Sequence, residues 1–377
     1  MIRRLLLLAG AAALFAACHD MVAPLGPRPS AATVATAPAA ITLDQQSSVL
    51  NDAEPWPAGG THVGKDFGPT NPHLGDAIVA TFFWRGTTNT ISIVTDHLCD
   101  VNSTPVGNRY TLVDYVTAGG YSMATYVATN VQGFPDPATT SEQKLCVHAL
   151  FSDTITEGGM IISAYQGVGT IAGVGAHSSA TGTGSTTTVA DPGAVALGVG
   201  ALAYGVTMSD GVVGTDPPPG FTNITDVGDA AIKADAQYAV FPGGGSADPR
   251  WNWYFTSLHS WLATALALNP PPHLVFTVQP KTTLPMMTIT PPVQVSVVDA
   301  SGNVVSGFTG TVTIAIGHNG GTLMPGTLSG TKTVTAVNGV ATFADLSIDQ
   351  LGNGYTLVVT AGGVTGAESA PFNIGAF

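Results

Sequence analysis

Four aromatic side chains gather in one short stretch of the sequence. The segment RWNWYF supplies Trp251, Trp253 and Tyr254, and Trp261 follows, whereas aromatic residues make up only 7% of the chain. Exposed indole rings offer flat faces to the C–H faces of sugars, and Arg250 beside them could add hydrogen bonds. The stretch indicates a ligand platform. In a strand, however, Trp251 and Trp253 share one face, so packing of that face in a core explains them equally well.

Three aspartates form the second candidate. Asp226, Asp229 and Asp235 lie close together in TDVGDAAIKAD. Carboxylate oxygens are the ligands that Ca²⁺ prefers, although the spacing does not follow the EF-hand pattern. The segment is either a calcium site between loops or a solvated turn. No other cofactor is predicted.

Signatures of common hydrolases are missing. The sequence has no G-x-S-x-G elbow and no zincin motif. Two positioned carboxylates suffice for glycoside hydrolysis, but Glu54, Glu142 and Glu157 lie in stretches that resemble loops. The segment GGTHVGK, which ends at Lys65, has the glycine spacing of a phosphate-binding loop, yet Asp66 stands where Ser or Thr would hold magnesium. We expect no enzymatic activity.

Two cysteines and two histidines lie in two short segments that could pair with each other. Cys99 and Cys146 remain as a pair if Cys18 is modified, and an oxidising compartment would allow them to form a disulfide. The alternative is two separately buried thiols. His97 and His148 lie close to these cysteines in sequence, so pairing of the two segments would bring the imidazoles together as a metal site. Ordinary histidines at strand ends are the alternative.

The first residues have the pattern of an export signal. Arg3 and Arg4 precede an apolar stretch that is too short to span a bilayer, and small residues lead to Cys18. The sequence LFAAC resembles the lipobox of bacterial lipoproteins, which implies a signal peptide over 1–17 and a lipid on the Cys18 thiol. An ordinary secretory signal is the alternative. His19 follows Cys18, which favours the outer membrane or cell surface. An Ala/Pro/Thr-rich stretch over 18–45 with almost no charge predicts a disordered tether.

Composition excludes one class of partner. Without Arg3 and Arg4, Lys and Arg fall from 11 to 9 against 24 acidic residues, so the net charge changes from −13 to −15. A chain this acidic lacks the basic surface that nucleic acids require. Charged residues are only 9% of the total, whereas about 25% is usual. The expected partners are the membrane, through the lipid on Cys18, and glycans or surface proteins.

The elements that would position these residues are strands. The first domain is expected over 46–269: after a turn-rich lead-in, short β-rich segments separated by Gly, Pro, Asn and Asp clusters fill about 74–269, and no amphipathic helical pattern is convincing. The uncharged run 194–208 is too short and too rich in Gly to span a membrane and predicts a buried strand. The segments GDAIVATFFWRG, GGMIISAYQGV and WLATALALNP resemble lectin-like jelly-roll modules of secreted bacterial proteins. The expected fold of this part is a jelly-roll β-sandwich.

A proline linker over 270–272 separates a second part, 273–377. Its segments PPVQVSVVDASGNVVSGFTGTVTIAI and TKTVTAVNGVATFADLSIDQLGNGYTLVVTA resemble bacterial immunoglobulin-like modules, which implies a second β-sandwich. Alternating Val293, Val295 and Val297 agree with this, as does a tight turn at Asn338. Tyr355 is expected to pack at a corner of the sandwich.

Together these features predict an all-β, lipid-anchored protein of the cell envelope with an adhesive, glycan-binding or structural display role. The alternative is a carbohydrate-active hydrolase or lyase on the jelly-roll scaffold, which rests on fold analogy alone.

Overall fold

The computed structural model describes residues 40–50, 61–68, 70–100, 102–132, 143–184, 189–211, 217–252 and 257–375. The regular elements in these ranges are β-strands, which confirms the predicted all-β class. None of these residues belongs to a helix that is long and apolar enough to cross a membrane. The predicted signal peptide, Cys18, Trp253 and Tyr254 lie outside the described residues.

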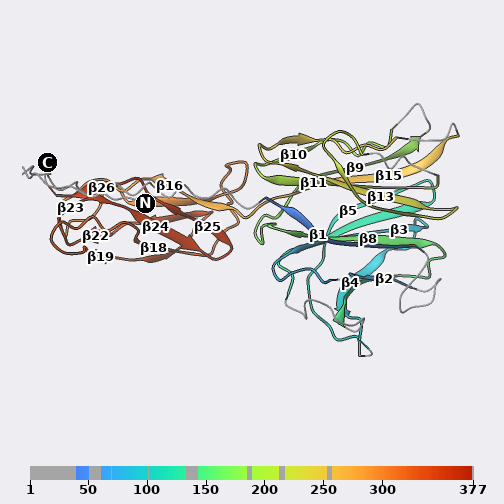
Figure 1. Ribbon diagram of the computed structural model, residues 1–377, viewed down its shortest axis with the longest axis horizontal. Coiled ribbons are helices and arrows are strands. Elements are labelled where there is room, and N and C mark those ends of the chain that lie inside the picture. The colour runs from blue at the N-terminus through green and yellow to red at the C-terminus, as the bar shows by residue number, and fades with distance from the viewer. Residues whose placement is uncertain are drawn as a thin grey trace, which may run out of the picture. The chain divides into compact units, whose positions relative to one another are not determined.

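Two five-stranded antiparallel sheets form the centre of the first part of the chain (Figure 1). Sheet A has the order β1 (Thr42–Leu50), β8 (Gly158–Gln166), β3 (Ala77–Arg85), β6 (Tyr121–Ala128) and β5 (Thr111–Ala118). Sheet C has the order β12 (Thr222–Gly228), β13 (Lys233–Phe241), β11 (Ala201–Ser209), β15 (His259–Leu268) and β9 (Val174–Gly184). Their facing side chains form one hydrophobic core, which includes Phe83, Ile161, Tyr204 and Leu266. The first part is therefore a β-sandwich.

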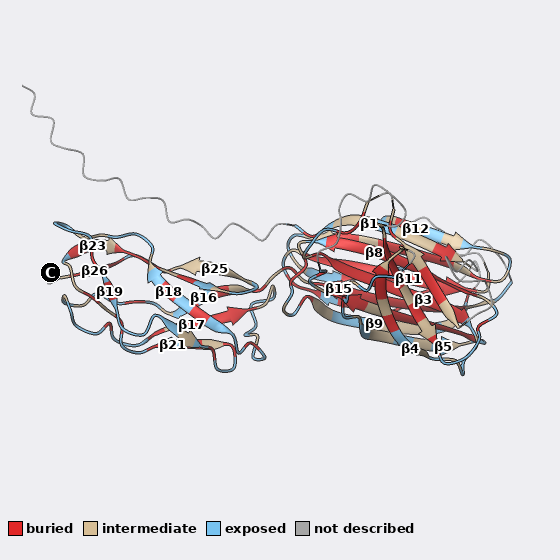
Figure 2. Ribbon diagram, turned by 90° about the horizontal axis from the view of Figure 1, so that it is seen from below, coloured by how far each residue is buried: buried red, intermediate tan, exposed pale blue. Residues whose placement is uncertain are grey.

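Smaller sheets cover the outer faces of both large sheets. Sheet B, with the order β2 (His62–Asp66), β7 (Leu145–Phe151) and β4 (Ile91–Leu98), packs on sheet A. The pair β10 (Val195–Leu197) and β14 (Gly245–Ala247) packs on sheet C. Because both faces of the large sheets are covered, β3, β8, β11 and β15 are buried almost continuously (Figure 2). Strands that are covered on both faces need apolar side chains at nearly every position, which explains the near-continuous apolar sequences of these four strands.

The two halves of the sandwich repeat one connectivity. Sheet A, read from β1, runs β1-β8-β3-β6-β5, and sheet C, read from β9, runs β9-β15-β11-β13-β12. In each half the first strand pairs with the last, β1 with β8 and β9 with β15. The other edge of the last strand pairs with β3 or β11. The hairpin β5–β6 or β12–β13 completes the sheet. The strand after the first and the strand before the last pair in the outer layer, as β2–β7 and as β10–β14. The first part of the chain is thus a topological duplication.

The structure changes two predictions about this part. The predicted tether, 18–45, overlaps β1, which begins at Thr42 and pairs with β8, while Ile41 is fully buried in the core. The sandwich thus starts before residue 46, since paired backbone and an apolar anchor hold these residues. The strand order also differs from the two Greek keys of a jelly roll, because each large sheet contains one contiguous half of the chain. The predicted buried strand over 194–208 is present as β10 and β11.

The second part of the chain is also built from strands. Its main sheet has the order β20 (Thr333–Thr335), β18 (Thr311–Ile316), β24 (Leu357–Ala361), β25 (Val364–Glu368), β16 (His273–Val278), β17 (Val293–Val298) and β21 (Val340–Phe343). Two short pairs complete it, β19 (Leu328–Ser329) with β22 (Ser347–Ile348) and β23 (Gly352–Tyr355) with β26 (Phe372–Ile374). These strands enclose a separate core.

Local predictions in the second part agree with the structure. Val293, Val295 and Val297 are fully buried. Asn338 and Gly339 both have positive φ, 51° and 78°, in a turn closed by hydrogen bonds between Val337 and Val340. Two consecutive positive φ angles define the type I′ turn that favours Asn-Gly.

Candidate functional site

Trp251 lies in the core rather than on a ligand platform. It is 1% exposed and packs with Trp261 and Ala263 on the outer face of sheet C. Its indole Nε1–H donates a hydrogen bond to Asp235 Oδ1 at 2.5 Å. Arg250 is exposed but is engaged with Asp191 and Asp248. A buried ring cannot stack on a sugar, so Trp251 is not part of a ligand platform. Trp253 and Tyr254 lie outside the described residues.

The three candidate calcium ligands have separate roles. Asp226 is exposed on β12, and Asp229 Oδ1 accepts hydrogen bonds from the backbone N–H groups of Ala231 and Ile232 in a turn. Asp235 is 2% exposed and bound to Trp251. Where the structure describes the chain, these aspartates do not belong to any group of three convergent metal ligands. Asp229 stabilises a turn, Asp235 accepts a buried hydrogen bond, and Asp226 is exposed on β12.

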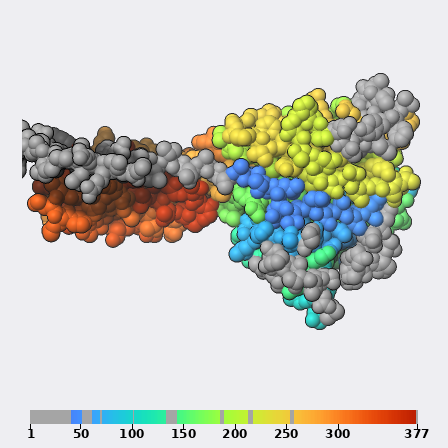
Figure 3. All heavy atoms as spheres, in the orientation of Figure 1, coloured from blue at the N-terminus to red at the C-terminus, as the bar shows by residue number. Residues whose placement is uncertain are grey.

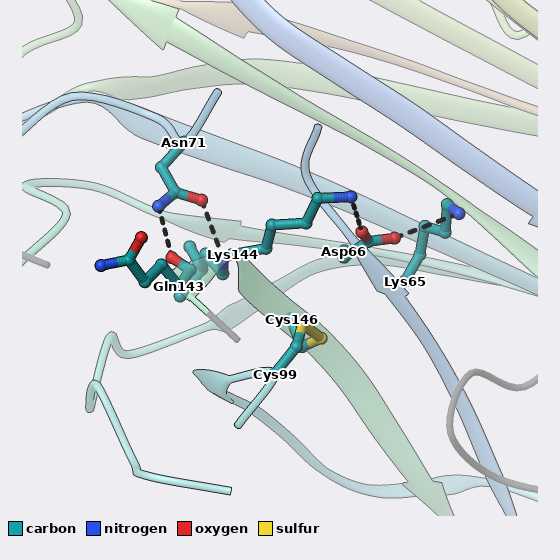
Figure 4. Close-up of polar contacts among 8 residues, drawn as sticks. Lys65, Asp66, Asn71, Cys99, Gln143, Lys144 and Cys146 are labelled. Carbon is teal, nitrogen blue, oxygen red and sulfur yellow. Dashed lines mark hydrogen bonds and ion pairs between the residues drawn. A yellow bond between two sulfur atoms is a disulfide. The ribbon is translucent and has the colours of Figure 1, made fainter. Parts of the chain in front are cut away.

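Cys99 and Cys146 form a disulfide, with Cα atoms 5.6 Å apart across 47 residues of sequence (Figure 4). The bond joins the end of β4 to the start of β7 in sheet B. In the same sheet, Asp66 Oδ2 accepts a hydrogen bond from Lys144 Nζ at 2.7 Å, and Lys65 Nζ lies 3.1 Å from Asp66 Oδ1. Burial alone would raise the pKa of Asp66, but the two ammonium groups lower it below its usual value. Lys65 thus belongs to a strand and an ion-pair network, not to a phosphate loop.

Sheet B also brings histidines together. The rings of His97 and His148 lie 4.9 Å apart, and His62 approaches His148 at 6.3 Å. His97 Nδ1 bonds to the carbonyl of Leu98, and His148 Nε2 to the hydroxyl of Thr95. Burial, followed by the neighbouring His97 and His62, lowers the pKa of His148 to about 4. The approach follows from the β4–β7 pairing, but the three imidazoles do not converge as metal ligands within the described ranges.

A different polar group is assembled where β1, β8 and β3 lie side by side. Asp44 occupies a β-bulge in β1, at the point where the pairing with β8 shifts between Leu43 and Gln45. Gln166 ends β8, and Asp76 immediately precedes β3. His73 lies in the connection that leads to Asp76. A bulge redirects a side chain out of the regular alternation, and here it places Asp44 against the other three residues.

The contacts within this group are short. His73 Nδ1 lies 2.9 Å from Asp44 Oδ2, and the backbone N–H of His73 donates to Asp76 Oδ2 at 2.8 Å. Gln166 Nε2 lies 3.1 Å from both Asp44 Oδ1 and His73 Nδ1. One ligand atom each from Asp44, His73 and Asp76 lie within 4.8 Å of one another, the only three-residue group of this kind among the described residues. We call these three residues the Asp44–His73–Asp76 cluster.

The electrostatics of the cluster are unfavourable for two free carboxylates. Asp76 is 3% exposed, and the Asp44 side chain is 10% exposed. Burial, with the adjacent Asp44 carboxyl adding to it, raises the pKa of Asp76 to about 7, although the backbone N–H of His73 acts in the opposite sense. The two carboxyls are thus held in a position that favours a positive charge or a shared proton between them.

The sequence interpretation missed this cluster for a clear reason. Asp44 lies in the segment assigned to the tether, and His73 and Asp76 stand as isolated polar residues before an apolar strand. A bulge in β1 and the pairing of β8 with β1 and β3 bring these residues together. Neither feature can be predicted from spacing along the chain.

Comparisons with known proteins give no relative: no family model, no curated protein and no solved structure matches the chain. The resemblances to bacterial lipoproteins, lectin-like modules and immunoglobulin-like modules therefore rest on the sequence segments quoted above.

Proposed function

We propose that the chain is an exported, lipid-anchored protein of the bacterial cell envelope that displays two β-sandwich parts and has a structural or adhesive role. The Cys99–Cys146 disulfide is the observation that carries this proposal. Disulfides persist in oxidising compartments outside the cytoplasm and are rare within it. The lipobox-like segment and the acidic, weakly charged composition agree with export.

The second part of the chain supports an immunoglobulin-like assignment. Tyr355 is fully buried, and its hydroxyl donates to the carbonyl of Gln350, five residues upstream, at 3.1 Å. This is the geometry of the tyrosine corner found in immunoglobulin-like sandwiches. Modules of this class commonly serve as spacers or partner-binding units in surface proteins.

Exposed apolar side chains in this part favour a partner-binding role. They lie in three loops that are held together by backbone hydrogen bonds, Met286 N to Ile348 O and Thr322 N to Leu351 O. Exposed apolar side chains that gather in one patch mark sites of protein–protein interaction. The exposed residues are Leu284, Met286, Met287, Leu323, Met324 and Leu351.

The glycan-binding version of the proposal is weaker than the adhesive version, because Trp251 is buried. The hydrolase or lyase alternative gains no support from the Asp44–Asp76 pair. Catalytic carboxyls of glycosidases stand roughly 5–9.5 Å apart across the scissile bond, whereas one oxygen atom each of Asp44 and Asp76 lie within 4.8 Å of each other.

Labelling with a radioactive fatty acid tests the proposal. In a bacterial host, the wild-type chain is expected to incorporate label and to sediment with membranes, whereas Cys18→Ser is expected to do neither. A wild-type chain without label would contradict the lipid anchor. A wild-type chain whose Cys99 and Cys146 are found as free thiols in cells would contradict export to an oxidising compartment.

A further inference from the structure

The Asp44–His73–Asp76 cluster contains the donors of a metal centre without a built-in counter-charge. Among the described ion pairs, the only cationic partner of Asp44 is His73, and no lysine or arginine pairs with Asp44 or Asp76. Two carboxylates held together in a largely buried position repel each other unless a cation or a proton lies between them. A bound cation would relieve this repulsion without protonation of either carboxyl.

The duplicated topology provides an internal comparison. Tyr165 pairs with Leu43 and Ala77 in the first half, and Leu268 pairs with Val174 and Leu202 in the second, so these positions correspond. The strand β9 also carries an irregularity here, as β1 does. Asp44 and Gln166 follow Leu43 and Tyr165 in sequence, and Asp76 precedes Ala77; the residues at the same positions in the second half are Gly175, Asn269 and Ala201, respectively.

This comparison shows that the fold does not require the carboxylates. The second half builds the same bulged edge and the same strand order with a glycine and an alanine at the two acidic positions. Burying an aspartate costs desolvation free energy. Where small residues build the same edge, this cost brings no packing benefit. A ligand that binds the carboxylates would explain their presence in the first half alone.

The donor set identifies the class of ligand. Ca²⁺ and Mg²⁺ select oxygen ligands, whereas an imidazole together with carboxylates suits Zn²⁺ and related first-row ions. Ligands of a tetrahedral Zn²⁺, each roughly 2.0–2.2 Å from the ion, lie about 3.4 Å from one another. Donor atoms that already lie within 4.8 Å of one another need only small side-chain rotations to reach this spacing.

We propose that Asp44, His73 and Asp76 bind one divalent transition-metal ion of the Zn²⁺ class, with Gln166 adjacent to it. The half-exposed His73 gives the ion a route from solvent, since its side chain is 51% exposed while the carboxyls are buried. Figure 3 shows β1, in blue, at the surface of the first part. The ion would fasten this edge strand to the segment before β3. This role rests on the lipid anchor proposed above. A mechanical force transmitted through the tether would act first on β1, and the ion would strengthen the attachment of that strand.

Calorimetric titration of the full-length chain with Zn²⁺ tests the site. The protein is purified without a histidine tag and freed of metal with a chelator. We expect one Zn²⁺ per chain, and we expect His73→Ala and Asp44→Asn each to weaken binding about tenfold or more, since even partners that merely orient metal ligands contribute that much. The thermal midpoint of the wild type is expected to rise with Zn²⁺, and that of His73→Ala to stay unchanged.

A matched control comes from another histidine–aspartate pair. His177 Nδ1 lies 3.5 Å from Asp114 Oδ2 but belongs to no three-ligand group within the described ranges. The variant His177→Ala is expected to bind Zn²⁺ like the wild type. Absence of Zn²⁺ binding by the folded wild type, equal binding by His73→Ala and Asp44→Asn, or binding of Ca²⁺ in preference to Zn²⁺ would each overturn the proposal. These outcomes do not depend on Cys18, so they are distinct from failure of the lipid anchor.

Discussion

Buried carboxylates in this protein differ in how completely they are hydrogen bonded. Asp96 accepts hydrogen bonds from the backbone N–H groups of Gly107 and Asn108, from the Asn108 side chain and from the Tyr110 hydroxyl. Asp235 accepts only from Trp251 and from Asn223 Nδ2, at 3.2 Å. Burial, together with the nearby Asp226, raises the pKa of Asp235 to about 7 despite these two donors. Asp235 is therefore a source of pH-dependent stability.

The folded protein should gain stability through Asp235 as the pH falls from 8 to 5. Its folded-state pKa lies above the ordinary value of 3.8, so in this window the folded state binds more protons than the unfolded state, and this contribution is lost as the pH rises through 7. We expect the free energy of unfolding of the wild type, relative to Asp235→Asn, to increase by about 2–3 kcal/mol from pH 8 to pH 5. Urea denaturation at both pH values measures this difference.

The comparison with Asp235→Asn is needed because His148 acts in the opposite sense. Its lowered pKa means that the unfolded state binds its proton first, so this contribution to stability is lost as the pH falls from about 6.5 towards 4. Both proteins contain His148, so its effect cancels in the difference. A difference that is independent of pH would contradict the role assigned to Asp235.

Trp251 should matter for stability rather than for ligand binding. Replacing it by Phe keeps most of the buried apolar area but removes the N–H donor to Asp235. A buried acceptor that loses its donor costs about 1–3 kcal/mol. We expect Trp251→Phe to lower the free energy of unfolding by that amount at pH 8, with no change in any glycan-array signal. Loss of a glycan signal in a variant of unchanged stability would contradict the core role.

At the scale of elements, the outer layers protect the two large sheets. Sheet B covers the face of sheet A that contains Trp84 and Phe82, both fully buried. Its three strands are short and are connected by long segments of chain, so strand pairing by itself holds sheet B weakly. The disulfide links β4 to β7, and the Lys144–Asp66 ion pair links the start of β7 to β2, so both hold the sheet in place.

Removal of the disulfide is expected to destabilise the first part. A cross-link across a separation of 47 residues restricts the unfolded chain by about 4 kcal/mol in the chain-entropy description. The double variant Cys99→Ala/Cys146→Ala should therefore unfold at a markedly lower urea concentration than the wild type. The variant His177→Ala, on another sheet, is a control that should leave this transition in place. An unchanged midpoint in the cysteine variant would show that sheet B packing alone suffices.

At the scale of the whole molecule, the chain combines an expected anchor with two folded parts. Each part has its own hydrophobic core, one between sheets A and C and one among β16–β26. The described residues contain no helix that could span a membrane, and the proposed anchor is the lipid on Cys18.

The location of the protein should depend on that single thiol. In a bacterial host, we expect Cys18→Ser to move the chain from the membrane fraction to the soluble extracytoplasmic fraction, while the Cys99–Cys146 bond still forms. Cell fractionation with thiol labelling measures both properties. A Cys18→Ser chain that stays with the membrane would indicate an anchor other than the lipid.

The all-β class followed from the order of the amino acids alone, because strand and turn preferences act over neighbouring residues. The sequence also indicated the tight turn at Asn338 and the burial of Val293, Val295 and Val297. It left open whether Trp251 faced a ligand or a core, whether Cys99 met Cys146, and where the sandwich began. These three points became clear from the folded chain, because each depends on which layer covers a strand or on which strands are neighbours. The Asp44–His73–Asp76 cluster has the same origin: its residues are distant in sequence, and a bulge in β1 and the pairing of β8 with β1 and β3 bring them together.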